Sequence, residues 1–344
     1  MKTPVRIVSL FLSVVMTLTA PLGLLMGKET AKLARAKEDC RVSFAAISDI
    51  HMRGNYKLIF RGMLELGLLD MERAQDKLDA VAFVGDVTNH GYVDQWDAFA
   101  DSVRGYDIAE NTMVVVGNHD TWGPNRDEFD DPEDGVKATF IRYNKTISGR
   151  DITEMYYSDI INGYPFIALG SETDSTSAYL SDTQLAWFAR EMEKAAATGK
   201  PIFVFMHQPI NQTHGLPYVW DLDKDDPPDK GGVGDQSAAL AAILKKYDNV
   251  FYISGHLHAG YKNADSRIGP AYACVETMEN DNGNPITLIN LPSYMYFDLQ
   301  RGGHIANGCG WVVEVYDGEV LLRARNFAAG TWITRYDRTV PLVG

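Results

Sequence analysis

The sequence predicts an α/β fold, in which strands of one or more sheets alternate with helices that cover them. Short apolar runs of strand length alternate with segments in which apolar residues recur at helical spacing. The apolar runs are nearly uninterrupted, as in strands that are buried on both faces. The chain has 344 residues, of which 45% are hydrophobic and 23% charged, so it can bury a large core. No linker divides it into independent domains.

The first half of the chain shows this alternation directly. It predicts strands at 41–48, 80–84 and 113–116, and helices at 57–78 and 94–104. Residues 121–165 are polar and without clear periodicity, which predicts an irregular insertion that ends in a strand at 164–170.

The second half continues the pattern. Ser181 and Gln184 have the spacing of a capping box, which predicts a helix from there to about residue 197. A strand at 202–206, a helix at 237–246 and a strand at 250–254 follow, with a second, acidic insertion near 211–236. The last eighty residues are β-rich, and Asp317-Gly318 predicts a hairpin turn. We therefore expect one domain over residues 37–344.

Residues 1–36 differ from the rest of the chain. A basic start is followed by the uncharged run 7–26, which is the pattern of a secretory signal and is also long enough to span a bilayer. Small residues at Ala20 and at Ala34-Arg35-Ala36 offer two cleavage sites. We expect export, either as a secreted protein or anchored at the outer face of the membrane through residues 7–26; a buried N-terminal helix is the alternative.

The charge of the chain bears on its partners. Five basic residues and one acidic residue give segment 1–36 a net charge of +4, so the remainder carries −18 of the total of −14. Such an acidic body repels long nucleic acids and argues against them as partners.

The three cysteines do not form a disulfide framework. Cys40, Cys274 and Cys309 are odd in number and irregularly spaced. One bridge between Cys274 and Cys309 and three buried thiols both remain open.

Polar residues follow five of the predicted strands at the point where each strand ends. Ligands of open α/β sheets bind beyond the carboxyl ends of the strands, so these side chains are expected to converge. Residues two apart in extended backbone point to the same side, which applies to the first and last pairs. The five groups are Asp49/His51, Asp86, Asn118/His119, His207 and His256/His258.

Carboxylate, imidazole and amide groups favour Mn, Fe, Zn or Ni over metals that prefer thiolates. The candidate ligands are too many for one tetrahedral ion. They suit two ions about 3.5–4 Å apart that share one carboxylate and one hydroxide.

This series of motifs resembles the calcineurin-like metallophosphoesterases over about residues 41–260. The resemblance implies a four-layer α/β/β/α sandwich of two mixed sheets flanked by helices. It implies that His119 contacts the phosphate and assists the leaving group, with Asp120 as its partner carboxylate. It also implies two metal sites that Asp86 bridges: Asp49, His51 and His258 at the first, and Asn118, His207 and His256 at the second.

The resemblance implies hydrolysis of a small phosphoester, either a diester or a monoester. Two cations would lower the pKa of a bridging water to roughly 7, and the resulting hydroxide would attack phosphorus. His119 would protonate the leaving group or donate a hydrogen bond to it.

The sequence differs from two groups of phosphatases in the superfamily, which narrows the expected class of substrate. Asn89 and His90 stand where protein Ser/Thr phosphatases of the superfamily carry aspartate and arginine, and Val116 stands at another of their arginines. His51 and Asn89 stand where purple acid phosphatases carry glycine and tyrosine. The pattern looks more like bacterial enzymes that act on small esters, cyclic nucleotides included.

The insertions leave several readings open. Their aromatic residues are expected to pack within the loops, with stacking on substrate as the alternative. The acidic run 221–229 is expected to be solvated rather than a Ca²⁺ site, since it lacks the EF-hand pattern. His90 lies near Asp86 in sequence and could touch substrate. The aromatic residues are Trp122, Tyr143, Tyr156, Tyr157, Tyr218 and Trp220.

Two other classes of function are weighed against the phosphoesterase. A non-catalytic metal-binding scaffold of the same fold would be expected to have lost ligands or His119, and this chain keeps all of them. A two-metal hydrolase of another bond, such as an amide, would need a glutamate base beside the motifs, and none is present.

Overall fold

The structure of the protein is a computed structural model. It describes residues 29–54, 58–121, 132–173, 176–216, 231–261, 272–295 and 307–344. The apolar run 7–26 lies outside these ranges. Within them, no helix combines the length and apolar character that crossing a bilayer requires.

Seven strands form the first sheet, which mixes parallel and antiparallel pairs. The neighbours run in the order β12-β11-β10-β1-β2-β3, and β13 pairs with β11. The pairs β1–β2 and β2–β3 are parallel, and the others are antiparallel. The strands are β1 (Val42–Ile47), β2 (Leu78–Val84), β3 (Ala109–Val115), β10 (Cys309–Tyr316), β11 (Glu319–Asn326), β12 (Thr331–Trp332) and β13 (Arg338–Pro341).

The second sheet has six strands in the order β4-β5-β6-β7-β9-β8. Its four central strands are parallel, and an antiparallel strand closes each edge. The strands are β4 (Tyr157–Ile161), β5 (Tyr164–Ala168), β6 (Ile202–Phe205), β7 (Val250–Ser254), β8 (Val275–Glu279) and β9 (Pro285–Asn290).

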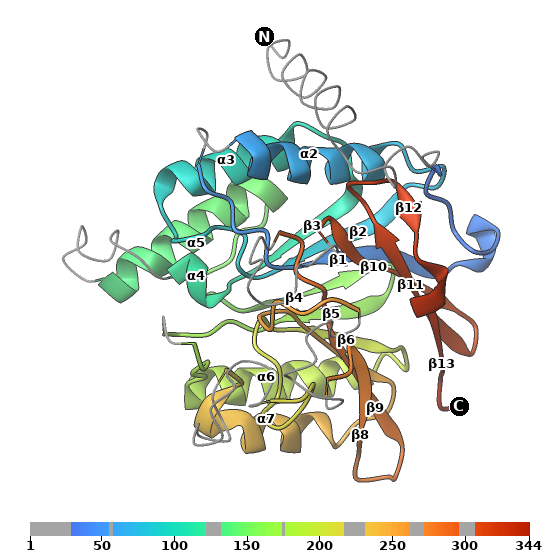
Figure 1. Cartoon of the computed structure of the whole chain (residues 1–344). Coiled ribbons are helices and arrows are strands. Elements are labelled where there is room, and N and C mark those ends of the chain that lie inside the picture. Colours follow the sequence, from blue (N-terminus) through green and yellow to red (C-terminus); the bar gives the residue numbers. More distant parts are fainter. Residues whose placement is uncertain are drawn as a thin grey trace.

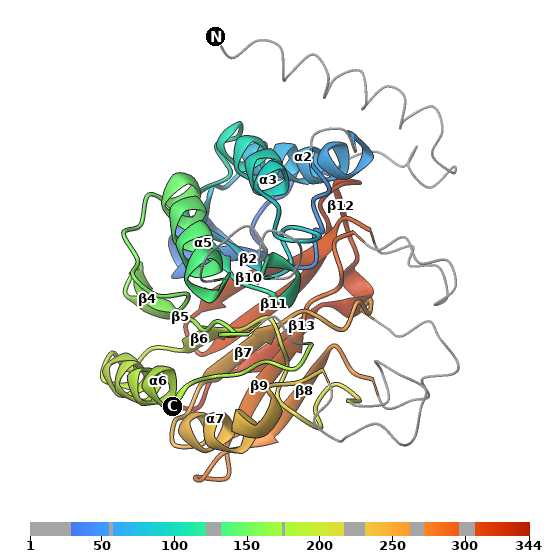
Figure 2. The same cartoon turned by 90° about the vertical axis from the view of Figure 1, so that its left-hand side faces the viewer.

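Helices cover the outer face of each sheet, which makes four layers (Figures 1 and 2). The helices α2 (Leu58–Glu72), α3 (Val93–Arg104) and α5 (Pro132–Ser148) pack on the first sheet, and α6 (Asp182–Ala196) and α7 (Ser237–Leu244) on the second. Short helical segments are α4 (Asn118–Thr121), η2 (Lys37–Asp39), η4 (Gly234–Gln236) and η7 (Thr334–Tyr336). The predicted sandwich of two mixed sheets flanked by helices is confirmed.

The two sheets pack face to face through a core of apolar side chains. Phe44 of β1 is fully buried there, and its ring lies edge-on to Phe166 at 5.0 Å and to Phe203 at 4.9 Å between centroids. Such contacts stabilise the core beyond the area they bury. They also join strands of the two sheets, which both lead to the site described below.

The prediction that residues 121–165 are irregular is wrong for much of that stretch. It contains helix α5 and strand β4. Val136, Phe140, Tyr143 and Ile147 recur at helical spacing and face the core of the first sheet. The polar residues between them obscure this period in the sequence.

Helix α6 starts as its capping signal predicts, but only half of the capping box forms. The Ser181 hydroxyl accepts a hydrogen bond from the Gln184 backbone N–H. The Gln184 side chain instead holds both backbone groups of Gly170, and Glu172 accepts the Ser181 N–H. The hydrogen bonds of Ser181 and Gln184 therefore connect the segment after β5 to the start of α6.

Residues 29–36, grouped with the leader in the sequence analysis, pack on the folded domain. Leu33 is buried against Cys40 and Tyr316. The Ala34 N–H donates to Glu314 at 2.9 Å, and the buried Arg325 guanidinium donates to the Glu29 carbonyl at 2.7 Å. The contacts of the folded domain thus extend back to residue 29.

All three cysteines are buried and unpaired. The sequence allowed either one disulfide or three buried thiols, and the structure agrees with three buried thiols.

Candidate metal centre

Six of the seven predicted ligands, all but Asn118, gather in two groups where strands of the two sheets end. Four of them follow their strands at the same offset, two residues past the last strand residue: Asp49 after β1, Asp86 after β2, His207 after β6 and His256 after β7. Asn118 opens the one-turn helix α4 after β3. The first sheet therefore supplies both carboxylates, together with His51 and Asn118, and the second sheet supplies only imidazoles.

The expected cause of convergence within the pairs is wrong. Asp49 and His51, like His256 and His258, do not lie in extended backbone: their φ angles are 56°, 49°, 73° and 50°. Asp86, with φ of 50°, shares this left-handed conformation. Non-glycine residues rarely adopt it, and such strain is characteristic of functional sites. Tight left-handed turns, not strand alternation, aim these side chains at one point.

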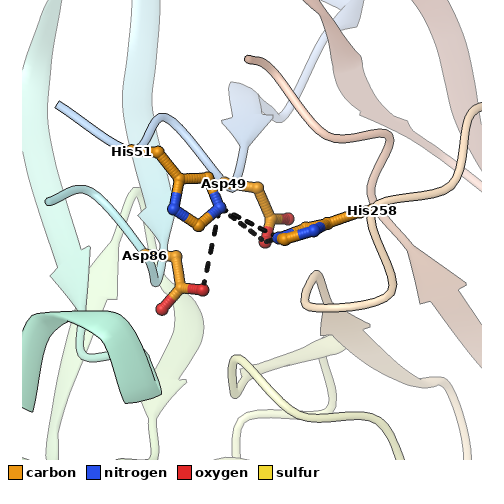
Figure 3. Close-up of side chains that lie close together, drawn as sticks. All are labelled: Asp49, His51, Asp86 and His258. Carbon is orange, nitrogen blue, oxygen red and sulfur yellow. Dashed lines mark hydrogen bonds and ion pairs between the residues drawn. The ribbon is translucent and has the colours of Figure 1, made fainter. Parts of the chain in front are cut away.

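The first ligand group consists of Asp49, His51, Asp86 and His258 (Figure 3). The His258 Nε2 atom lies 3.2 Å from Asp49 Oδ1 and 2.9 Å from His51 Nε2. The His51 Nε2 atom lies 3.9 Å from Asp86 Oδ2. Figure 3 shows the four side chains pointing toward one another from different segments.

The second group consists of Asp86, His207 and His256. The His207 Nε2 atom lies 3.1 Å from Asp86 Oδ2 and 3.3 Å from His256 Nδ1. Asp86 belongs to both groups, as expected of a bridging ligand. All ligand atoms within each group lie within 4.8 Å of one another.

The chemistry of these donors fits two metal ions. Within the described ranges, the Asn118 Oδ1 atom is buried and accepts no hydrogen bond, an arrangement that buried amides usually avoid. Two imidazole nitrogens 2.9 Å apart, beside a carboxylate, suit a shared cation. Asp49, His51 and His258 would hold one ion, Asn118, His207 and His256 the other, and Asp86 both.

Electrostatics keeps the carboxylates of the site ionised. Burial alone would raise the pKa of Asp49, but the hydrogen bond from His258 and the nearby imidazoles lower it to about 2. Burial likewise opposes ionisation of Asp86, and the charges of His207 and His119 outweigh it and lower the pKa well below the usual value.

The histidines divide into two protonation classes. Burial lowers the pKa of His51 to about 3 and that of His256 well below its usual value, so both rings are neutral and can ligate. Burial acts in the same direction on His207, but Asp86 raises its pKa to about 9. His207 must therefore release a proton when it binds a metal.

Backbone contacts orient His207. Its Nδ1 atom lies 2.9 Å from the Val84 carbonyl, to which it donates, so Nε2 faces Asp86. Gly85 makes this approach possible: a Cβ there would lie 2.4 Å from the His207 ring, and its φ is 80°. Gly117 is constrained similarly, since a Cβ would lie 2.3 Å from Asp86 Oδ1. These contacts explain the glycines that precede Asp86 and Asn118.

His119 lies beside both ligand groups without belonging to either. Its ring stands edge-on to His51, with 4.8 Å between centroids. Its backbone N–H donates to Asp86, and its Nδ1 atom lies 2.8 Å from the Asn89 carbonyl. The donation to Asn89 leaves Nε2 as the nitrogen that can act on a substrate.

The expected pairing of Asp120 with the His119 ring is not what the structure shows. The buried Asp120 carboxylate accepts hydrogen bonds from Val87 N, Thr88 N, Thr88 Oγ1 and Gly117 N. Burial and the negative charge of Asp86 raise the pKa of Asp120 to about 6. Asp120 thus holds the loop that carries Asp86, and the Asn89 carbonyl orients His119. A carbonyl oxygen has no sequence signature, so the sequence could not reveal that role.

The aromatic residues of the insertions pack within the protein where they are described. The Tyr143 ring stacks on Trp96 at 5.3 Å, Tyr156 lies against Trp187 at 4.7 Å, and the Tyr157 hydroxyl donates to the Val114 carbonyl. The remaining predictions for these insertions, the acidic run included, lie outside the described residues, as do Trp122, Tyr218 and Trp220.

Comparison with known proteins agrees with this geometry. The sequence model of the family "Calcineurin-like phosphoesterase" matches residues 42–260. A probable glycerophosphodiester phosphodiesterase GpdQ from Arcobacter nitrofigilis is 23% identical over 221 residues, which cover 62% of this chain and 70% of that protein.

Solved structures show the same fold. A dimetal phosphatase from Danio rerio superposes with a TM-score of 0.54 at 15% identity, covering 89% of this chain and 100% of that one. The purple acid phosphatase PPD1 from yellow lupin superposes with a TM-score of 0.54 at 13% identity, covering 87% of this chain and 53% of that one.

Proposed function

Because the chain belongs to the calcineurin-like phosphoesterase family, we propose that it hydrolyses a small phosphodiester at a centre of two metal ions. The protein is a metal-dependent phosphoester hydrolase. The observation that supports the two-metal reaction is Asp86, a single buried carboxylate shared by two groups of ligands. The relative with a phosphodiesterase name favours a diester over a monoester.

The residues of the site would have two roles: binding the metal ions and assisting the leaving group. When bound, two cations supply a hydroxide nucleophile at neutral pH and neutralise charge on the phosphate oxygens. Asp49 and Asp86 stay ionised and would hold these ions, and the neutral rings of His51 and His256 offer their lone pairs. His119, fixed through Nδ1, would present Nε2 to the leaving oxygen and donate a proton or a hydrogen bond.

Turnover of two chromogenic esters tests this proposal. Purified full-length protein is assayed with bis-p-nitrophenyl phosphate and p-nitrophenyl phosphate after chelation and after reloading with Mn²⁺, Zn²⁺ or Fe²⁺. We expect activity only with metal, and a preference for the diester. The variant His119→Ala should retain two ions per chain and lose about 100-fold or more in kcat. Two bound ions without turnover of either ester would favour the alternative, a metal-binding scaffold, and no bound metal would overturn the proposal.

We also propose that the chain is exported, through the basic start and apolar run of its first 26 residues. The contacts of residues 29–36 with the domain favour a cut before residue 29 over one after Ala36. Intact-mass measurement of the protein from the cell envelope and medium tests both points. A mature chain that starts at Lys37 would contradict the position of the cut, and a purely cytosolic protein would contradict export.

A further inference from the structure

We propose that Arg53 and His90 form a substrate-binding rim beside His119 that selects esters whose leaving group carries an anionic group. This inference rests on the proposed function and adds to it the chemical class of the leaving group. It is carried by the backbone between the β1 and β2 loops, by the ring contacts of His90 and by the placement of the Arg53 guanidinium.

The loops that follow β1 and β2 continue the parallel pairing of their strands past the metal ligands. The His51 N–H donates to the Asp86 carbonyl at 2.9 Å and the Met52 N–H to the Val87 carbonyl at 3.0 Å. The Asn89 N–H then donates back to the Met52 carbonyl at 3.0 Å. This register pairs Met52 with Thr88, so Arg53 lies opposite Asn89, the residue before His90, at the end of the ladder.

The His90 side of this rim is rigidly held. The Gln95 side-chain oxygen accepts the backbone N–H groups of Asn89 and His90 at 3.1 and 2.8 Å, and Gln95 is buried. The Thr88 hydroxyl accepts the Gly91 N–H at 3.0 Å. The loop is therefore preorganised rather than shaped by a bound molecule.

The imidazole of His90 extends the row of rings that leads out of the metal centre. Its centroid lies 6.4 Å from that of His119 and 5.6 Å from that of Tyr92. Burial, followed by the positive charges of His119 and Arg53, lowers the pKa of His90, so the guanidinium acts on this ring. A group that extends outward beyond His119 would meet His90 and Arg53.

Arg53 is exposed but not loosely placed. Its guanidinium lies 4.7 Å from the centroid of the Phe60 ring at the start of α2. Within the described part of the chain, it forms no ion pair with a carboxylate, whereas Arg41, Arg61 and Arg325 each do. It carries a positive charge two residues beyond His51, on a body (residues 37–344) whose net charge is −18.

A planar guanidinium binds carboxylate and phosphate groups through two parallel hydrogen bonds. An ester with a neutral leaving alcohol gains nothing from this charge, whereas one with a carboxylate or a second phosphate does. Carboxylate and phosphate share the recognition chemistry, and the test uses the carboxylate.

The experiment compares two diesters that differ in one group: methyl 4-carboxyphenyl phosphate and methyl 4-carbamoylphenyl phosphate. The full chain, loaded with metal, is assayed as wild type, Arg53→Gln and Arg53→Lys. The ratio of kcat/KM for the carboxylate over the amide should fall about tenfold in Arg53→Gln, which corresponds to about 1.4 kcal/mol. The fall should lie in KM, Arg53→Lys should retain part of the ratio, and added salt should reduce the preference of the wild type.

Arg142→Gln is the matched control. Its exposed guanidinium also lies 4.7 Å from an aromatic ring, that of Tyr143, but on α5, so the variant removes the same charge elsewhere. It should keep the ratio of the wild type. An unchanged ratio in Arg53→Gln, or an equal fall in Arg142→Gln, would overturn the rim.

A binding measurement separates this inference from the proposed function. Non-hydrolysable phosphonates with the same carboxyl and carboxamide groups are titrated into the same proteins by calorimetry. Wild-type protein that binds the carboxylate more tightly, with the difference lost in Arg53→Gln, supports the rim even where no ester is cleaved. Equal affinity of the wild type for both phosphonates contradicts the rim, whereas failure to cleave either ester counts against the proposed function alone.

Discussion

At the scale of single residues, Asp86 is the described side chain that the two ligand groups share. It belongs to both ligand groups, and its Oδ1 atom accepts the His119 N–H at 2.9 Å. Its negative charge raises the pKa of His207. The backbone of this residue is left-handed, so the turn that presents it is itself under strain.

The variant Asp86→Asn should lose metal and activity together. The amide has the same shape but lacks the charge that holds two cations, so we expect fewer than two ions per chain after dialysis and a loss in kcat/KM of about 100-fold or more. Metal analysis and diester turnover measure the two effects. The control variant is Asp79→Asn, which makes the same change at the opposite end of β2, where Asp79 binds Lys37 and Ser43. Asp86→Asn with two tightly bound ions would contradict the bridging role.

At the scale of elements, two local structures decide how the chain works. One is the loop after β2, held by Asp120 and Gln95, which presents Asp86, the Asn89 carbonyl and His90. The other is the segment 29–36, which lies on the first sheet. Arg325, fully buried, binds Asp70 through two hydrogen bonds of 2.6 and 2.7 Å and also binds the carbonyl of Glu29.

Removing residues 29–36 should destabilise the domain without changing its chemistry. The loss of the buried Leu33 side chain alone should lower the free energy of unfolding by about 2 kcal/mol. Thermal unfolding of a chain that starts at Glu29 is compared with one that starts at Lys37. Leu33→Ala in the longer chain should reproduce part of the effect. Arg35→Gln, which removes a largely exposed pair with Glu319 and a cation–π contact with Tyr316, should have a smaller effect. Equal unfolding temperatures of the two chains would mean that the segment adds no stability.

At the scale of the whole molecule, the centre joins the two sheets. Asp49 and Asp86 follow strands of the first sheet, and His207 and His256 follow strands of the second. Between the sheets, the core around Phe44 sets their spacing. A metal bound by ligands from both sheets therefore favours the folded arrangement over any state in which the sheets separate.

Chelation should lower the unfolding temperature of the whole protein. A metal present at a thousand-fold excess over its Kd stabilises the folded state by about 4 kcal/mol. We expect EDTA to lower the melting temperature by several degrees in calorimetry, and Mn²⁺ or Zn²⁺ in excess to restore it. Asp86→Asn should respond much less to either treatment. A wild-type melting temperature that chelation leaves unchanged, with metal shown to be removed, would contradict the linkage.

The sequence by itself determined the fold class, the family resemblance and the identities of the residues that meet at the centre. These follow from local patterns: apolar strands of a few residues, each followed within two residues by Asp, Asn or His. Strand β7 occupies the predicted range 250–254, and α6 begins after the predicted cap at Ser181. Parallel strands end at one edge of a sheet, so the convergence of these residues could be predicted without knowing which side chains are in contact.

Only the tertiary structure decided how that gathering is achieved and what supports it. The left-handed turns at Asp49, Asp86 and His256 depend on backbone bonds between neighbouring loops. The bond from His119 to Asn89 and the role of Asp120 join residues about 30 positions apart, and Arg325 reaches nearly 300 positions back to Glu29. Such partners leave no periodic signal, because hydrogen bonds to backbone atoms constrain geometry rather than the type of amino acid that accepts them.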